Sequence, residues 1–100
     1  MMMAPLRGPE PGRVLAAALL ARLPADAHLI DQVRIPWASA TFLGTQHRLL
    51  LSCRDAAALH SFAGTIAEAD IPLRGHLLAD IHAEATGEIL SVEALTLVEA

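Results

Sequence analysis

Three side chains of types that bind metal ions lie at even spacing in the second half of the chain: His76, Asp80 and His82. Residues 73–85 alternate between apolar and polar types, which predicts a strand. Alternate side chains of a strand share a face, roughly 7 Å apart. Imidazole and carboxylate groups both bind zinc, but Asp80 and His82 could share an ion only if a neighbouring strand supplied another ligand. We therefore predict no metal site. His76, Asp80 and His82 are the candidate ligands if a metal ion binds to this chain.

The interpretation that we favour for these side chains is a polar sheet face of ordinary residues. If a partner covers that face, the same groups become hydrogen-bonding groups of an interface. No other group of residues has a spacing that catalysis requires. None of the four serines lies in a G-x-S-x-G motif, and neither His47 nor His60 has a nearby partner that would mark a general base. We predict no catalytic residue and no cofactor.

The composition is apolar and weakly acidic. Hydrophobic residues make up 54% of the 100 residues, charged residues only 18%, and the formal net charge is −4. The length indicates one domain, and the charge offers no basic patch for nucleic acid. The only cysteine, Cys53, follows an apolar run and is expected to be a small core residue. So few charges favour self-association, and we expect a homo-oligomer.

The N-terminal part of the chain has some features of a secretion signal. Residues 1–12 carry three prolines and two glycines without periodicity, and we assign them to an N-terminal arm. Residues 14–20 are apolar and precede an Ala-Asp-Ala triplet, which imitates a secretion signal. Arg22 interrupts this run, and the run is too short to span a membrane, which takes about 20 residues. We expect a cytoplasmic protein without a membrane segment, with secretion as the alternative.

The chain then reads as a single α+β domain over residues 13–100. We predict helices over residues 13–23 and from Ser52, as a possible cap, to residue 69. Strands are predicted over 28–35, 37–43, 47–53, 73–85 and 89–98, with turns at 44–46 and 86–88. Pro36 marks a strand end, bulge or edge, because proline cannot donate to a central ladder. This pattern predicts a two-layer sandwich: a mainly antiparallel sheet of four or five strands with two helices on one face.

The apolar positions predict which side chains meet. The second helix has its apolar stripe at Leu59, Phe62, Ala63 and Ile66. In the strand over 73–85, we expect the odd positions to pack on the helices and the even ones to be wetter. The first helix is apolar on most sides, so it either lies between the sheet and the second helix or forms a subunit contact. The candidates for an oligomer interface are Leu15, Leu19, Leu20 and Trp37.

Short sequence words at matching places in this order of elements resemble the tail-completion or tail-terminator family of tailed phages and gene transfer particles. They are HRLLL at residues 47–51, LRGHLL at 73–78 and ALTLVE at 94–99. The resemblance implies a small α+β protein that forms rings, typically hexameric, at the end of a tail tube, with a structural and not a catalytic role. The chain is shorter than is usual there, and its segment before residue 47 lacks a longer, aromatic-containing connection. No binding residue is carried over.

Two functions remain open at this point. The first is a non-enzymatic, homo-oligomeric structural or interaction protein, in the form of a ring component if the resemblance holds. The alternative is a small ligand-binding or catalytic domain with its site on the predicted His76/Asp80/His82 face. A large apolar subunit interface would favour the first, and titratable groups that converge in a cleft would favour the second.

Overall fold

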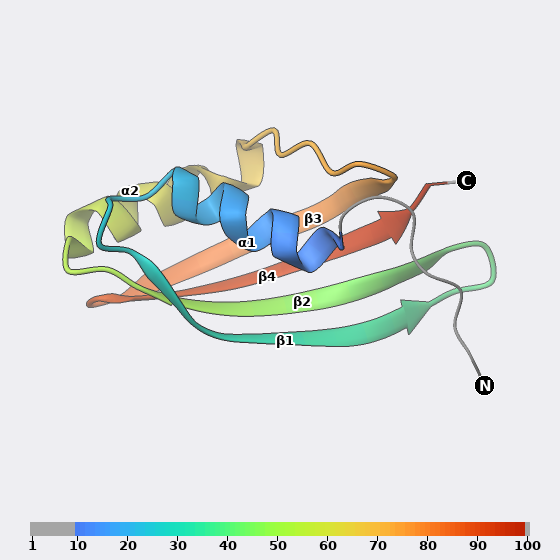
Figure 1. Cartoon of the computed structure of the whole chain (residues 1–100), viewed down its shortest axis with the longest axis horizontal. Coiled ribbons are helices and arrows are strands. Elements are labelled where there is room, and N and C mark those ends of the chain that lie inside the picture. The colour runs from blue at the N-terminus through green and yellow to red at the C-terminus, as the bar shows by residue number, and fades with distance from the viewer. Residues whose placement is uncertain (1–9, 100) are drawn as a thin grey trace.

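The computed structural model describes residues 10–99, and within them the chain forms two layers. A four-stranded antiparallel sheet carries both α-helices on one face, so the predicted α+β sandwich is confirmed (Figure 1). The elements in chain order are α1 (Pro11–Ala21), β1 (His28–Ala38), β2 (Leu43–Ser52), α2 (Ala56–Thr65), a 3₁₀ turn η1 (Ile66–Glu68), β3 (His76–Thr86) and β4 (Ile89–Val98). No helix in this part of the chain has the length and apolarity needed to cross a membrane.

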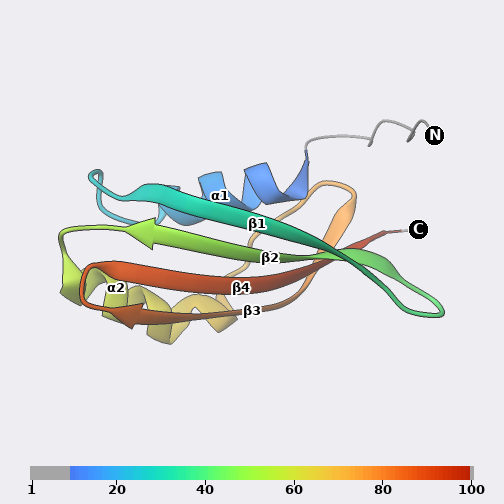
Figure 2. The ribbon, with the colours of Figure 1, turned by 90° about the horizontal axis from the view of Figure 1, so that it is seen from below.

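The strands are ordered β1-β2-β4-β3, so β2 and β4 form the centre and β1 and β3 the edges. Both pairs of sequence neighbours are hairpins, and β4 returns antiparallel beside β2. The turn between β3 and β4 is tight because Gly87 adopts a φ of 59°, a conformation that glycine accepts without strain. Figure 2 shows the sheet from the side away from the helices, which no element covers among the described residues; we call this the open face.

The first hairpin differs from the sequence prediction. One strand, β1, runs through Pro36, and the turn lies at residues 39–42, whereas we predicted a strand over 37–43 and a turn at 44–46. Proline is tolerated because β1 is an edge strand, which needs hydrogen bonds to β2 on one side only. Ser39 holds the turn, since its Oγ accepts a hydrogen bond from the backbone N–H of Phe42 at 3.1 Å.

The helices begin at acidic caps. Glu10 accepts hydrogen bonds from the backbone N–H groups of Gly12 and Arg13, so α1 starts at Pro11, inside the segment that we assigned to the arm. The rest of that predicted arm, residues 1–9, lies outside the described residues. The cap of α2 is Asp55, which accepts from the N–H of Ala58 at 3.0 Å, and not Ser52, which still belongs to β2. An N-cap carboxylate satisfies N–H groups that the helix itself leaves free.

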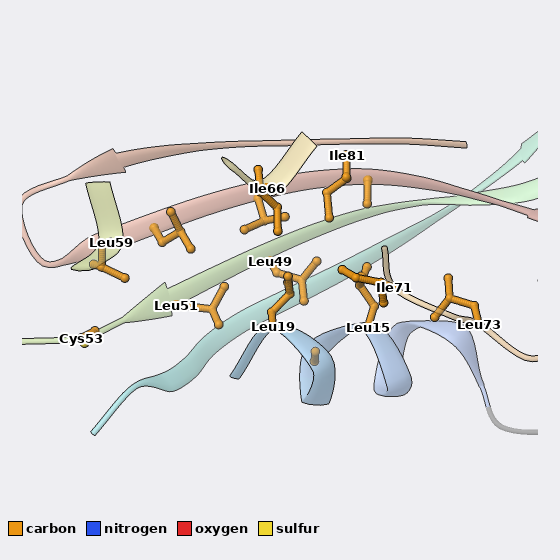
Figure 3. Close-up of a cluster of buried hydrophobic side chains, with 14 residues drawn as sticks. Leu15, Leu19, Leu49, Leu51, Cys53, Leu59, Ile66, Ile71, Leu73 and Ile81 are labelled. Atoms are coloured by element: carbon orange, nitrogen blue, oxygen red, sulfur yellow. The ribbon is translucent and has the colours of Figure 1, made fainter. Parts of the chain in front are cut away.

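The core lies between the sheet and the two helices (Figure 3). Leu15 and Leu19 of α1 are fully buried against β2 and β4 residues such as Leu49 and Leu51, which are also fully buried. The predicted stripe of α2 is confirmed, with Leu59 and Ile66 buried. Because Leu15 and Leu19 are enclosed by their own chain, they offer no surface to a partner, and our choice of these two as interface residues is corrected. The other two candidates, Leu20 and Trp37, are half-buried.

A bulge in β3 changes which side chains share a face. The pairing with β4 moves from Leu78–Thr96 to Asp80–Leu95, so Ala79 is an extra residue in β3. Beyond the bulge the prediction is right, because Ile81 and Ala83 face the helices. Before the bulge the two faces are exchanged. His76 is therefore buried on the helix side, and Leu77 lies on the open face.

Candidate functional site

One row of charged side chains crosses the open face. The strand register places Val33, Arg48, Glu93 and His82 side by side on β1, β2, β4 and β3. Nε of Arg48 lies 3.6 Å from Oε2 of Glu93, and Nε2 of His82 lies 3.3 Å from Oε1 of the same carboxylate. The side chains of Arg48 and Glu93 remain 64% and 51% exposed, so their ion pair contributes at most about 1 kcal/mol to stability. Arg48, His82 and Glu93 of this row, together with Asp80, line a hollow of about 140 Å³.

The metal-site candidates do not converge on one point. His82 has Asp80 at 4.0 Å from Nδ1 and Glu93 at 3.3 Å from Nε2, and these two nitrogens lie on different sides of the imidazole ring. An ion bound to one nitrogen would therefore meet only one of the carboxylates. His76 is on the other face of the sheet, where its Nδ1 lies 3.1 Å from the carbonyl oxygen of Arg74. No group of three or more metal-binding side chains gathers within residues 10–99.

Apolar side chains lie on both sides of the charged row, mixed with polar ones: the next row away from the β1–β2 turn holds Asp31, Leu50, Ser91 and Glu84. Toward the β1–β2 turn, the register aligns Trp37, Gly44, Leu97 and Leu77 across the four strands of the open face. On the other side of the row lie Leu50 and Ile89, from β2 and β4. Val33, Leu77 and Ile89 belong to the large hydrophobic residues that stay exposed. An antiparallel sheet can leave one face in water, but these large apolar side chains leave apolar area exposed on it, which is a feature of interaction surfaces.

A second apolar surface lies at the end of the sheet beside the β1–β2 turn. It is a groove of about 390 Å³, which we call the end groove, lined by Thr41, Phe42, Leu43, Leu77, Leu97, Val98 and Glu99. Leu43 is 65% exposed and Phe42 is 51% exposed. We predicted a strand and a turn over residues 37–46 and no groove there.

His47, on the helix side of β2, is one of three buried polar residues within residues 10–99, together with His76 and Thr96. Its Nε2 lies 2.9 Å from Oγ1 of Thr96, and its Nδ1 has no hydrogen-bond partner among residues 10–99. Burial lowers the pKa of His47, because the charged ring loses its hydration; Glu10 raises this pKa, whereas Arg34 and His76 lower it further. His47 is thus held neutral inside the fold.

Acid is expected to destabilise the fold through His47. The unfolded chain binds a proton at this residue near its ordinary pKa of 6.5, whereas the folded chain does so only at lower pH. Stability is therefore complete above pH 6.5 and falls as the pH drops below it, by at most about 1.4 kcal/mol per pH unit. Urea unfolding between pH 7.5 and 5 should show this slope and should lose most of it in His47→Gln. The control His60→Gln, at an exposed histidine, should keep the slope of the wild type. An unchanged slope in His47→Gln would contradict this explanation.

Cys53 has the core role that the sequence predicts. Its thiol is buried, with Sγ 3.5 Å from Oδ1 of Asp26. Burial raises the pKa of Cys53, and the neighbouring carboxylates of Asp26 and Asp55 raise it further, although the backbone N–H of Asp55 opposes them. The reactive thiolate is therefore disfavoured. Asp26 has a structural task here, because it accepts a hydrogen bond from the backbone N–H of Arg54 at 2.9 Å.

Known proteins give no independent indication of function. Comparison with family models, with curated proteins and with solved structures finds no match to this chain. We therefore take the open face and the end groove as the candidate functional surfaces of this chain.

Proposed function

We propose that this chain is a non-enzymatic structural protein that assembles with copies of itself. The observation that carries the proposal is the amount of large apolar side chain left outside the core: Val33, Leu77 and Ile89 on the open face, and Phe42 and Leu43 at the end groove. Exposed apolar area of this kind is typical of an interaction surface. The low content of charged residues, 18%, supports the same interpretation, because little repulsion keeps copies apart.

The specific form that we propose is a ring component, similar to the tail-terminator proteins. Its support is the sequence resemblance together with the presence of two apolar surfaces, the open face and the end groove, which adjoin at Leu77 and Leu97. A chain with two different surfaces can contact two neighbours, and contacts of this kind close into rings when the rotation between copies allows it. Light scattering on the purified full chain, followed by negative-stain imaging, tests the proposal. We expect a mass several times 10.6 kDa and closed particles, and a strict monomer would contradict it.

The end groove is expected to contribute to assembly beyond a pair of copies. The double variant Phe42→Ser with Leu43→Ser should lower the mass of the largest species, because it removes apolar area that only a neighbour could cover. Its melting temperature should stay close to that of the wild type, since both side chains are more than half exposed in one copy. Ile30→Ser, a change at a similarly exposed residue of β1 outside the groove, is the control. An unchanged mass distribution in the double variant would count against the groove.

A small-ligand site is the second candidate, in a revised place. His76 does not belong to it, and the groups that do meet on the open face are Arg48, Asp80, His82 and Glu93. The hollow that they line, about 140 Å³, is smaller than the roughly 300–1,000 Å³ of common ligand pockets. A titration of the chain with zinc, followed through the His82 ring signals in NMR spectra, tests this candidate. Saturable shifts at micromolar zinc would favour it over the structural role.

A further inference from the structure

The two charges at the centre of the open face lie on opposite sides of the midline of the sheet, while the acidic Asp31, Asp80 and Glu84 lie on its two outer strands. The midline runs between the two central strands, with the positive Arg48 on β2 and the negative Glu93 directly opposite on β4. Both side chains are more than half exposed, so both retain the capacity for another partner. A surface that repeats this row in the opposite order would bring an opposite charge to each of them.

A second copy of the chain presents that opposite order. We infer that two copies pack open face to open face about a twofold axis that is parallel to the strands and passes between β2 and β4. This rotation leaves the position of every row along the strand direction unchanged. It exchanges the two sides of the sheet, so that β2 lies over β4 and β1 lies over β3. Arg48 of one copy then faces Glu93 of the other, and the reverse, which gives four alternating charges at the centre of the interface.

The same rotation brings apolar rows together. Trp37 on β1 and Leu77 on β3 belong to the same row. Because the rotation places β1 of one copy over β3 of the other, Trp37 of one copy lies over Leu77 of the other. A twofold axis across the strands through this row would instead put β2 over β2 and Arg48 over Arg48, and like charges that face each other are destabilising. At the central row the charges therefore favour the axis along the strands, although that rotation also sets Asp31 of one copy opposite Glu84 of the other.

The edges of the sheet do not offer an equal alternative. On β1, Pro36 has no N–H group, and the N–H of Gln32 already donates to Oδ1 of Asp31 at 2.9 Å. On β3, the helix α2 packs against the strand and extends past its outer side in Figure 2. Proline, local side-chain hydrogen bonds and covering helices all hinder the addition of another strand. A second copy therefore meets fewer obstacles on the open face.

The size of the open face is sufficient for a pair. Four strands about 4.8 Å apart and roughly 33 Å long cover about 600 Å² in projection, or about 1,200 Å² for both copies, which reaches the lower end of specific interfaces. This inference rests on the proposed function, because it names the surface through which the first pair of copies forms. The end groove overlaps this contact at Leu77 and Leu97, whereas Thr41 and Phe42 in the β1–β2 turn lie beyond the paired strands and can contact another neighbour.

Charge reversal on the two central strands tests the inference. Arg48→Glu by itself places four negative charges at the centre of the pair, and Glu93→Arg places four positive ones there. Each variant alone should raise the dissociation constant of the pair at least tenfold, as measured by sedimentation. When the two variants are mixed, the glutamate introduced in one copy faces the arginine introduced in the other, and the two unchanged residues, Glu93 and Arg48, face each other. Mixed pairs should therefore form, and native mass spectrometry can identify them by mass.

The mixture also separates this interface from effects inside one copy. Each variant lacks its internal Arg48–Glu93 ion pair, and mixing does not restore that pair, so recovered association reports on the contact between copies. Arg74→Glu, the same charge reversal in the exposed loop before β3, is the matched control and should associate like the wild type. Thermal melts show whether each variant is folded. If a single variant does not fold, the double variant Arg48→Glu with Glu93→Arg replaces it in the test, and it should pair like the wild type.

The possible outcomes distinguish this inference from the proposed function. Mixed pairs in excess over both homogeneous pairs support the twofold stacking of open faces. If the wild type associates but the single variants associate equally well, the inference is wrong and the proposed function stands on another surface. If the wild type has a mass of 10.6 kDa at every concentration, both are wrong.

Discussion

Alanine in place of Leu19 is expected to lower the free energy of unfolding by about 2–5 kcal/mol, the usual loss for a leucine removed from a closed core. Leu19 has no exposed area and joins α1 to the sheet (Figure 3). The substitution keeps the helix propensity of the site high, so the loss reports on packing. For a domain of this size it should lower the melting temperature by more than about 10 °C. Urea and thermal unfolding measure both quantities.

Leu20 is the control on the same helix. It is half-buried at the margin of the core, so Leu20→Ala removes the same atoms from a position that water already reaches. We expect a loss well below that of Leu19→Ala. Equal losses at the two positions would show that α1 is not seated on the sheet through the face described here.

Two glycine-to-alanine changes are expected to have opposite signs. Gly44 lies on β2 where a Cβ atom would be 2.2 Å from the carbonyl oxygen of Thr96 and 2.9 Å from Cδ2 of Leu97. A backbone oxygen of the adjacent strand cannot move away without disturbing the β2–β4 pairing. Gly44→Ala should therefore cost at least about 1–3 kcal/mol, as overpacking does. Urea unfolding gives the sign and the size.

Gly64 is the matched position in α2. A Cβ atom there would meet nothing within 4 Å, and its backbone φ is not in the left-handed region. Gly64→Ala should stabilise the chain by about 0.5–1 kcal/mol, because alanine has less conformational freedom to lose in a helix. Destabilisation by Gly64→Ala would indicate a neighbour at this site that a single copy does not contain.

The sequence predicts the fold class well, and the reasons are local. The strand over 89–98 matches β4 at both ends, because strict alternation begins directly after a turn that contains Gly87. The stripe of α2 is also right, since its four apolar positions follow one helical face. The first hairpin was misplaced at Pro36, because a single sequence does not show that β1 is an edge strand. The cost of proline in a strand depends on that tertiary position.

The candidate site was predicted only in part. Asp80 and His82 do share a face, but the bulge at Ala79 moves His76 to the other one, and alternation continues through a bulge without an obvious sign in the sequence. Glu93 and Arg48 join the site through strand register, which depends on how distant segments pair. A usable signal for the apolar part was the alternation of Val33, Ile35 and Trp37, which continues across Pro36 and marks one face of a single strand.

The fluorescence of Trp37 on dilution tests the central claim most directly, that copies of this chain cover the open face. Trp37 is the only tryptophan, and it is half-buried on that face in one copy. We predict an emission maximum that moves to longer wavelength as the full chain is diluted, in step with the loss of mass in sedimentation, because separation exposes the indole to water. A spectrum that stays constant while the mass falls would contradict the account, since the copies would then meet elsewhere.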